Sequence, residues 1–408
     1  MKWALAGMVA TVATVACGGS GGTVAQGDGV AESPLSACAP VPPTERKTSP
    51  MAAPLDERAQ RSRDLAEQVL REHAVTLDNP WALGHALLAL GPEVLLPSGE
   101  GAVEGLFRRY GQWIPGGVER GVMFPRSVGD VRVEPHTALL LKAFTETGVD
   151  PTREVSVEGR ATTVASLYCG TQYRSWVDGD QHSFESWNDT PWALQGLAAW
   201  SPVGTEWVAG GGHAMELRAF SSGVVDVYHQ ETQFLRTARA KNASFEKRKQ
   251  GVFGYTCGGA HLLQAAAYAV GRGHGGEEDA VRLGEAQHNL MARYGVEMRA
   301  VDTAIKAYPK YELKLRIQRL KFLGHYLESM HKLGAMGMVS VTPQAQSSVD
   351  EAREELVVTL ETIEKLGWFD NLEAIRSADE QAYLDLLGDT AHALRGLDLS
   401  SGEGSLLL

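Results

Sequence analysis

A helix-start signal followed by a short apolar helix recurs along this chain, and no other feature restricts its fold as strongly. The signal is Pro, Asp, Thr or Gly, and the apolar stretch behind it runs for about ten residues at helical spacing. Several copies begin with an N-cap residue or Pro and end at Gly, as helices do. Such a long period predicts one helical unit built repeatedly. Six copies occur roughly every 50 to 70 residues, at 79–91, 134–148, 188–200, 256–271, 321–334 and 388–397.

Between these segments lie more polar, amphipathic helices. The recurring segments are rich in Ala, Leu and Gly on nearly every side, as buried helices are, whereas the intervening ones carry one charged face. We therefore predict an all-α fold of about twelve alternating inner and outer helices. Strand signals are sparse, apart from one small hairpin expected at 123–135. The outer helices are expected at 59–75, 102–111, 162–174, 216–241, 277–294 and 349–366.

This alternation resembles the (α/α)6 toroid of six-hairpin glycoside hydrolases, polysaccharide lyases, prenyltransferases, terpene cyclases and lanthipeptide cyclases. The resemblance covers about 340 residues and rests on the helical pattern, not on a family signature, so it implies an architecture and no particular activity. An open solenoid of similar hairpins is the alternative.

The beginning of the chain has the features of an export signal. Residues 1–16 combine Lys2 with an apolar run of about 14 residues, which is too short to span a bilayer and is typical of a signal peptide. Ala16 and Cys17 resemble a bacterial lipoprotein cleavage site, although Thr14 stands where such sites usually have an aliphatic residue. We expect Cys17 to be lipidated and the protein to lie in the bacterial cell envelope, with plain secretion or a retained anchor as alternatives.

Composition sets the domain boundaries and excludes one class of partner. Residues 17–54 are rich in Gly, Ser, Pro and Ala and predict a flexible tether, followed by a helical domain at 55–400 and a tail at 401–408. The net charge is -12 without a basic stripe, which excludes a nucleic-acid partner and electrostatic docking on anionic lipid. Membrane contact is therefore expected only through the N-terminal lipid anchor.

In a closed ring, the starts of the inner helices would converge on one mouth, where unpaired N–H groups and positive dipole ends collect. The chain has 12 histidines, and five fall within the recurring segments at similar positions. We expect these polar side chains to line a central cavity and bind a ligand. The alternative is that each histidine is a core residue bonded to a neighbouring helix. The set comprises His85, His136, Asp189, Cys257, His261, Asp389 and His392, with His325 somewhat deeper.

Carboxylates and aromatic residues are densest between residues 173 and 192. Flat aromatic rings cover a sugar face, while two carboxylates can act as general acid and base around a glycosidic bond. The alternative is a polar loop whose tryptophans anchor it. The catalytic candidates are Asp180, Glu185, Asp189 and His182, and the binding candidates are Trp176, Trp187 and Trp192.

Cys257 precedes His261 by four residues, so the two would share one face of a helix. Three interpretations stay open. The first is a Cys–His nucleophile, since a helix N-terminus lowers a thiol pKa. The second is a zinc site that adds Cys169 and either His182 or water. The third is a Cys169–Cys257 disulfide. The double glycine Gly258–Gly259 also fits simple close packing of helices.

Two short motifs are similar to those of lanthipeptide cyclases, which bind zinc through two Cys and one His. They are "YCG" at 168–170 and "TCGGAH" at 256–261. The Cys-His-Gly triplet of that family is absent from the sequence, which puts the ligand set in doubt.

Three functions follow as hypotheses. The first is an exported, lipid-anchored hydrolase or lyase that acts on a polysaccharide or peptidoglycan-type polymer. The second is a zinc-dependent enzyme that uses Cys169, Cys257 and His261. The third is a non-catalytic surface scaffold or binding protein whose histidines are core residues.

Overall fold

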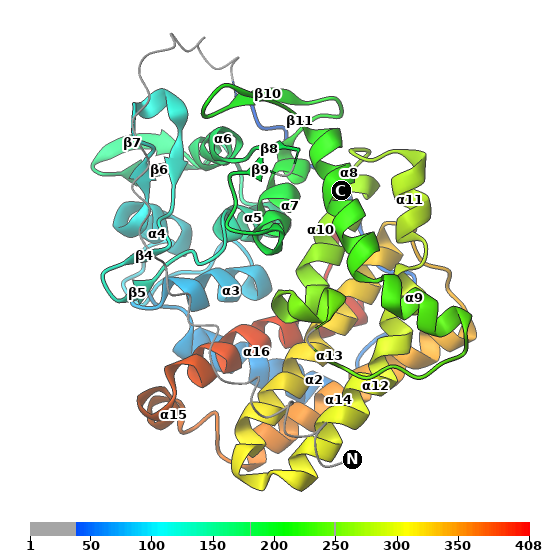
Figure 1. Ribbon diagram of the computed structural model, residues 1–408. Helices are drawn as coiled ribbons and strands as arrows, with labels where there is room; N and C mark the ends of the chain where they lie inside the picture. The colour runs from blue at the N-terminus through cyan, green and yellow to red at the C-terminus, as the bar shows by residue number, and fades with distance from the viewer. Residues whose placement is uncertain (1–37, 180, 249) are drawn as a thin grey trace.

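The computed structural model describes residues 38–179, 181–248 and 250–408, and helices dominate this part of the chain (Figure 1). The protein is mainly α-helical with several small two-stranded hairpins. None of the helices in these ranges combines the length and apolar character needed to cross a membrane.

Six helices correspond to the six recurring apolar segments. They pack in sequence, because α3 contacts α5, α5 contacts α7, α7 contacts α10, α10 contacts α13, α13 contacts α16, and α16 returns to α3. Every residue of α7 is buried, as expected for a helix that is apolar on all sides. The six are α3 (Pro80–Leu90), α5 (Leu139–Thr147), α7 (Thr190–Trp200), α10 (Ala260–Gly271), α13 (Glu312–Ala335) and α16 (Glu380–Ser401).

Side-chain caps explain where several helices begin. Asn79 accepts a hydrogen bond from the Ala82 amide ahead of Pro80 in α3, and Asp379 accepts one from the Ala382 amide at the start of α16. Helices α13 and α16 begin about two turns earlier than their apolar segments predict. Their first turns are polar, so the apolar pattern alone cannot locate these starts.

The polar helices pack against these six. Helix α2 contacts α16, α4 contacts α3, α6 contacts α7, α8 contacts α7 and α10, and both α12 and α14 contact α13. Two predicted helices are divided, at Thr232 between α8 and α9 and at Gly284 between α11 and α12. The bounds are α2 (Glu57–His73), α4 (Ala102–Tyr110), α6 (Ala165–Arg174), α8 (Leu217–Glu231), α9 (Gln233–Ala240), α11 (Glu277–Leu283), α12 (Ala286–Ala307), α14 (Pro343–Lys365) and α15 (Leu372–Ala378).

Short antiparallel hairpins fill the connections. The predicted hairpin is confirmed as β4 (Ser127–Val128) and β5 (Val131–Arg132). The other hairpins were not expected, since strands of two to four residues are too short for a period-two pattern. They are β2 (Gln112–Trp113) with β3 (Val122–Met123), β6 (Glu154–Val157) with β7 (Arg160–Thr163), β8 (Val177–Asp178) with β9 (Gln181–His182), and β10 (Glu206–Ala209) with β11 (His213–Glu216).

The two ends of the described chain cover the C-terminal ends of inner helices. Strand β1 (Arg46–Lys47) pairs with β12 (Leu406–Leu407). The Val41 amide donates to the Trp200 carbonyl at the end of α7, and the Ala53 amide donates to Ser400 near the end of α16. Residues 38–54 and 404–408, within the predicted tether and tail, contact the body through these bonds. Met51, Leu406 and Leu407 are buried there, whereas Val41 is exposed. Residues 1–37, which include Cys17, lie outside the described residues.

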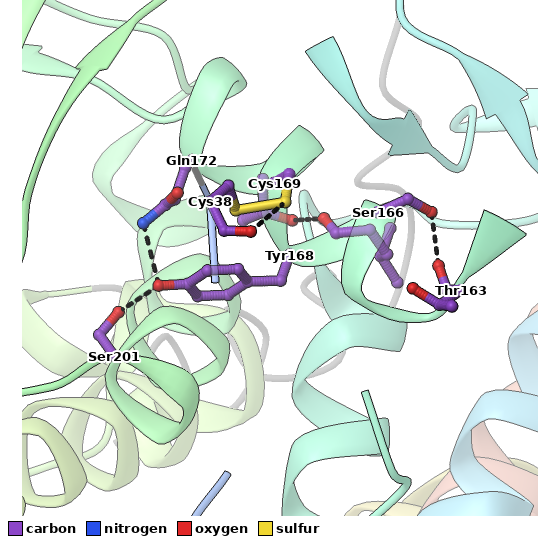
Figure 2. The surroundings of a disulfide bond; sticks show 9 residues. Cys38, Thr163, Ser166, Tyr168, Cys169, Gln172 and Ser201 are labelled. Carbon is purple, nitrogen blue, oxygen red and sulfur yellow. Dashed lines mark hydrogen bonds between the residues drawn. A yellow bond between two sulfur atoms is a disulfide. The ribbon is translucent and has the colours of Figure 1, made fainter. Parts of the chain in front are cut away.

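A disulfide joins Cys38 to Cys169 in α6 (Figure 2). Beside it, the Tyr168 hydroxyl lies 2.7 Å from Ser201 Oγ and accepts a hydrogen bond from Gln172. The predicted Cys169–Cys257 disulfide is therefore wrong, and so is the role of Cys169 as a zinc ligand, because its sulfur is already bonded. Cys38 was not predicted as a partner because it lies in a segment whose composition predicts a flexible tether.

The closest approach of two inner helices depends on Gly324 in α13. A Cβ at this position would lie 2.8 Å from the Ala393 amide nitrogen and 2.9 Å from the His392 carbonyl carbon, both in the backbone of α16. Because backbone atoms cannot rotate away, we expect Gly324→Ala to destabilise the protein by about 1–3 kcal/mol. Urea denaturation measures the change in the free energy of unfolding.

Gly295→Ala is the matched control, in the interior of α12. Its Cβ would meet only the end of the flexible Arg299 side chain, at 3.1 Å. We expect this variant to be stabilised by up to about 1 kcal/mol, as for Gly to Ala in an exposed helix. Equal effects of the two substitutions would contradict the described packing of α13 on α16.

Candidate metal centre

Histidine side chains from four of the six inner helices lie close together. His85 comes from α3, His261 from α10, His325 from α13 and His392 from α16. The ring centroids of His325 and His392 are 3.8 Å apart, those of His261 and His325 4.8 Å, and those of His85 and His392 5.5 Å. Trp192 of α7 closes the group with its ring 4.8 Å from that of His261. The structure therefore brings these side chains together as the shared helical position predicted.

Cys257 is held toward this group by an unusual turn. It belongs to a short 3-10 segment, η4 (Thr256–Gly259), in which Cys257, Gly258 and Gly259 have φ angles of 51°, 61° and 76°. Left-handed backbone is rarely adopted by a non-glycine residue and persists only where surrounding structure imposes it. The Gly258 carbonyl accepts a hydrogen bond of 2.9 Å from Arg293, and a Cβ on Gly259 would collide with Val252. The glycine pair is thus required by the turn that presents Cys257.

Three donor groups converge where this turn meets the histidines. The Cys257 sulfur and one ring nitrogen each of His261 and His325 all lie within 4.8 Å of one another. Tetrahedral zinc with bonds of 2.0–2.3 Å needs donors roughly 3.5 Å apart, so small side-chain rotations suffice. His261 Nδ1 and both ring nitrogens of His325 are buried without a hydrogen-bond partner in the described part of the chain. Buried nitrogens without partners are unfavourable, and a metal ion would satisfy them.

Burial also sets the protonation states of these donors. It lowers the pKa of His261 well below its usual value and lowers that of His325. Both rings are therefore neutral near pH 7, and each carries the lone pair that a metal requires. Burial raises the pKa of the Cys257 thiol to about 12, which outweighs the lowering expected at a helix start. This raised pKa weakens the Cys–His nucleophile interpretation, which needs an activated thiolate.

A second group of donors shares His325. His325, Glu328 and His392 also hold ligand atoms within 4.8 Å of one another. Here the carboxylate is already engaged, because Glu328 accepts from Lys332 at 2.7 Å and lies 2.9 Å from His392 Nδ1. In the first group both His261 and His325 have ring nitrogens without a hydrogen-bond partner among the described residues, whereas in the second group only His325 does. We therefore place the candidate metal with Cys257, His261 and His325.

A buried cluster of charged side chains adjoins the histidine group. The Lys332 ammonium is within 3.0 Å of both Glu146 oxygens and 2.7 Å from Glu328, and Lys142 is 2.9 Å from Glu146. Gln264 accepts a further hydrogen bond of 3.1 Å from Lys332. These residues were not among those predicted from the sequence. A sequence pattern that could have indicated them is a pair of opposite charges four residues apart inside an apolar segment. It occurs at Lys142–Glu146 and again at Glu328–Lys332.

Lys321, one turn before His325 on α13, lies between two carboxylates. Lys321 Nζ is 3.5 Å from Asp385 and 3.6 Å from Asp389. Asp389 is buried, one of its oxygens has no hydrogen-bond partner among the described residues, and burial raises its pKa well above the usual value. Lys321 and Asp389 lie close enough to Cys257 to shift its pKa in opposite directions. A titratable pair therefore lies beside the proposed metal ligand.

The predicted catalytic carboxylates are placed differently from one another. Asp189 is buried, 2.6 Å from His136 Nδ1, and the His136 ring stacks on Trp192 at 3.9 Å. Arg126 pairs with both Asp189 and the exposed Glu185. One cation thus neutralises both carboxylates, while Asp180 lies outside the described residues.

The remaining predicted side chains lie on the hairpins or beside them. His182 Nδ1 is 2.8 Å from the Phe184 carbonyl, and its ring meets the edge of Trp187. Trp176 stacks on His213 at 3.9 Å. Each of these two tryptophans is half-buried against a histidine, whereas Trp192 is buried at the histidine group itself. The three predicted binding tryptophans therefore do not form one platform.

A small cavity adjoins the metal candidates. Its volume is about 20 Å³, which is room for roughly one water molecule and far below that of a typical ligand pocket. Its polar lining consists of His85, Lys142, Trp192, His261 and His392. A large substrate would therefore have to react at the edge of the histidine group, since the cavity cannot admit it.

Comparison of the chain with protein-family models, curated proteins and solved structures finds no match.

Stability should fall in acid because buried histidines are neutral in the folded state. Burial lowers the pKa of His331, fully buried in α13, from 6.5 to about 4. Below pH 6.5 the unfolded chain binds more protons, so the free energy of unfolding decreases as pH falls from 6.5 to 4 and is unaffected by this group above 6.5. The contribution of His331 is on the order of 3 kcal/mol. Urea denaturation between pH 7 and pH 4 measures it.

His331→Gln is the informative variant. A glutamine amide can still donate to Ser400 Oγ, which lies 2.9 Å from His331 Nε2, but it does not titrate. We expect a shallower pH dependence by about one proton in this variant. An unchanged slope would show that His331 does not titrate as described.

Proposed function

We propose that this protein is a zinc-dependent enzyme whose centre is held by Cys257, His261 and His325. The observation that carries the proposal is the convergence of these three donors within 4.8 Å, with His261 and His325 nitrogens buried and unsatisfied in the described structure. A thiolate with two imidazoles suits zinc better than it suits hard cations. Three protein ligands leave one position open, where zinc supplies Lewis-acid chemistry to a substrate oxygen.

We further propose that the six inner helices close into an (α/α)6 toroid. The packing order that begins at α3 and returns to α3 supports this, as does the placement of α2, α4, α6, α8, α12 and α14 against them. The β1–β12 pair and the segments beside it cover the C-terminal ends of α7 and α16. Access would then be from the opposite end, where η4 presents Cys257.

The side chains around the centre suit a hydrolase or lyase. His261 and His325 would bind the metal as neutral ligands, and Cys257 would lose its proton on binding. Asp389 and Lys321 lie near Cys257 and supply groups that can hold or release a proton. Raised carboxyl pKa values of this kind are typical of catalytic acids.

Export through a signal peptide at 1–16 and anchoring through Cys17 belong to the same proposal. The Cys38–Cys169 disulfide supports it, because disulfides persist mainly outside the cytoplasm. The substrate would then be a component of the bacterial cell envelope.

A glycan hydrolase or lyase that works through carboxylates is the second candidate. It is favoured by the half-buried Trp176 and Trp187, each packed against a histidine, and by the position of Trp187 between Glu185 and Asp189 in the sequence. The pairing of both carboxylates with Arg126 weakens it, because the same guanidinium occupies the oxygens with which the two groups would act on a glycosidic bond. A polysaccharide or peptidoglycan-type ligand fits either candidate.

Metal analysis tests the leading proposal. We expect the purified protein to hold about one zinc ion per chain, as a site with three protein ligands predicts. Cys257→Ser and His261→Ala should each remove most of it, whereas His331→Gln should retain it, since His331 lies on α13 outside the donor group. Zinc content is measured by mass spectrometry after dialysis. A wild-type protein without metal would remove this proposal and leave the carboxylate-based candidate and the non-catalytic scaffold.

Glycan binding tests the second candidate. If the tryptophans hold a sugar, Trp176→Ala should weaken binding to purified peptidoglycan by roughly tenfold, because a lost aromatic contact is worth on the order of 1 kcal/mol. Trp113→Ala is the control, since Trp113 lies on β2 and donates to the Val157 carbonyl. Co-sedimentation measures the affinity, and equal losses in both variants would exclude a Trp176 subsite.

A further inference from the structure

Glu328 lies on α13 one turn after His325, and the protein buries it completely. Residues three apart share a helix face, so the carboxylate is directed toward the imidazole. Glu328 Oε2 lies 3.5 Å from His325 Nδ1 and 2.9 Å from His392 Nδ1. One carboxylate oxygen thus faces both histidines.

This arrangement distinguishes the two nitrogens of His325. Nδ1 faces Glu328, so Nε2 is the nitrogen left for a metal shared with Cys257 and His261. The separation of 3.5 Å is too long for a good hydrogen bond, and neither ring nitrogen has a partner among the described residues. A small rotation of the ring would shorten this contact while Nε2 turns toward the other two donors.

The other oxygen of Glu328 is fixed from below. Oε1 accepts a hydrogen bond of 2.7 Å from Lys332, which is bonded in turn to Glu146. The Lys332 ammonium forms a buried ion pair with Glu328 and so fixes the position of the carboxylate. A fixed, charged acceptor therefore faces Nδ1 of His325.

We propose that Glu328 is a positioning residue for the metal centre. It accepts a hydrogen bond from the Nδ1–H group of His325 and so directs Nε2 to the metal. It also holds His392 outside the ligand set. The inference rests on the proposed function. A carboxylate behind a metal-bound histidine orients the ring and increases its basicity, and its loss typically weakens metal binding by 10- to 100-fold.

The buried charge cluster provides a matched pair of variants. Glu328→Gln with Lys332→Met replaces the carboxylate with a neutral, weaker acceptor without leaving an unpaired charge, since Glu146 keeps Lys142. Glu146→Gln with Lys142→Met makes the same kind of change one step away and leaves Glu328 with Lys332. Among the described contacts, neither Glu146 nor Lys142 hydrogen-bonds to His325 or His392. Circular dichroism establishes that both variants are folded.

The readouts are the zinc dissociation constant and the absorption spectrum of the cobalt-substituted protein. We expect the Glu328 variant to bind zinc 10- to 100-fold more weakly and the Glu146 variant to stay within about threefold of wild type. Both should keep the thiolate-to-cobalt charge-transfer band, because Cys257 remains a ligand. A merely structural role of Glu328 would affect the two variants alike.

Three results would overturn the inference in different ways. Equal dissociation constants for the two variants would remove the role of Glu328 and leave the proposed metal centre intact. A wild-type cobalt spectrum without the thiolate band would place the metal with His325, Glu328 and His392, where Glu328 is a ligand. Absence of metal binding by the wild type would remove the proposed function itself. If the double variants do not fold, Glu328→Asp, which keeps the charge but shortens the side chain, should still weaken binding.

Discussion

The hydrogen bonds of the buried Lys332 ammonium hold the centre of this protein together. Its acceptors are Glu146 from α5, Gln264 from α10 and Glu328 from its own helix, α13. With Lys142 the cluster contains two lysines and two glutamates, so its formal charge is balanced. Buried charges are tolerated only when they are paired and hydrogen-bonded, and removal of one partner is strongly destabilising. The relative placement of three inner helices, and of the histidines that they carry, therefore depends on this cluster.

The histidine group extends this polar centre toward the starts of the inner helices. Glu328 connects the two layers, because one of its oxygens meets Lys332 and the other meets His392. The left-handed turn of η4 places the Cys257 thiol next to the neutral imidazoles of His261 and His325. The opposite end is covered by both ends of the described chain, which pair as β1 and β12. The molecule thus has one end that is covered by both chain ends and another where polar side chains gather.

The helical pattern could be predicted because it is local. Caps and apolar periodicity located the six inner segments, and the common position of their histidines anticipated the meeting of His261, His325 and His392. The partner of Cys169 could not be predicted, since Cys38 lies 131 residues away in a segment whose composition suggested a tether. The ion pair between Asp189 and Arg126 could not be predicted for the same reason, because Arg126 lies 63 residues earlier in the chain, next to strand β4.

The sequence by itself determined the main helical segments and one hairpin, the division into apolar and amphipathic helices, and the residue types available at the centre. Those properties follow from hydrophobic periodicity and capping, which act over a few residues. Only the tertiary structure decided which donors stand together: it replaced Cys169 with His325 beside Cys257 and His261, and it placed Glu328 behind them. Ligand sets depend on distances of a few ångströms between segments far apart in the chain. Such distances arise only when the helices pack.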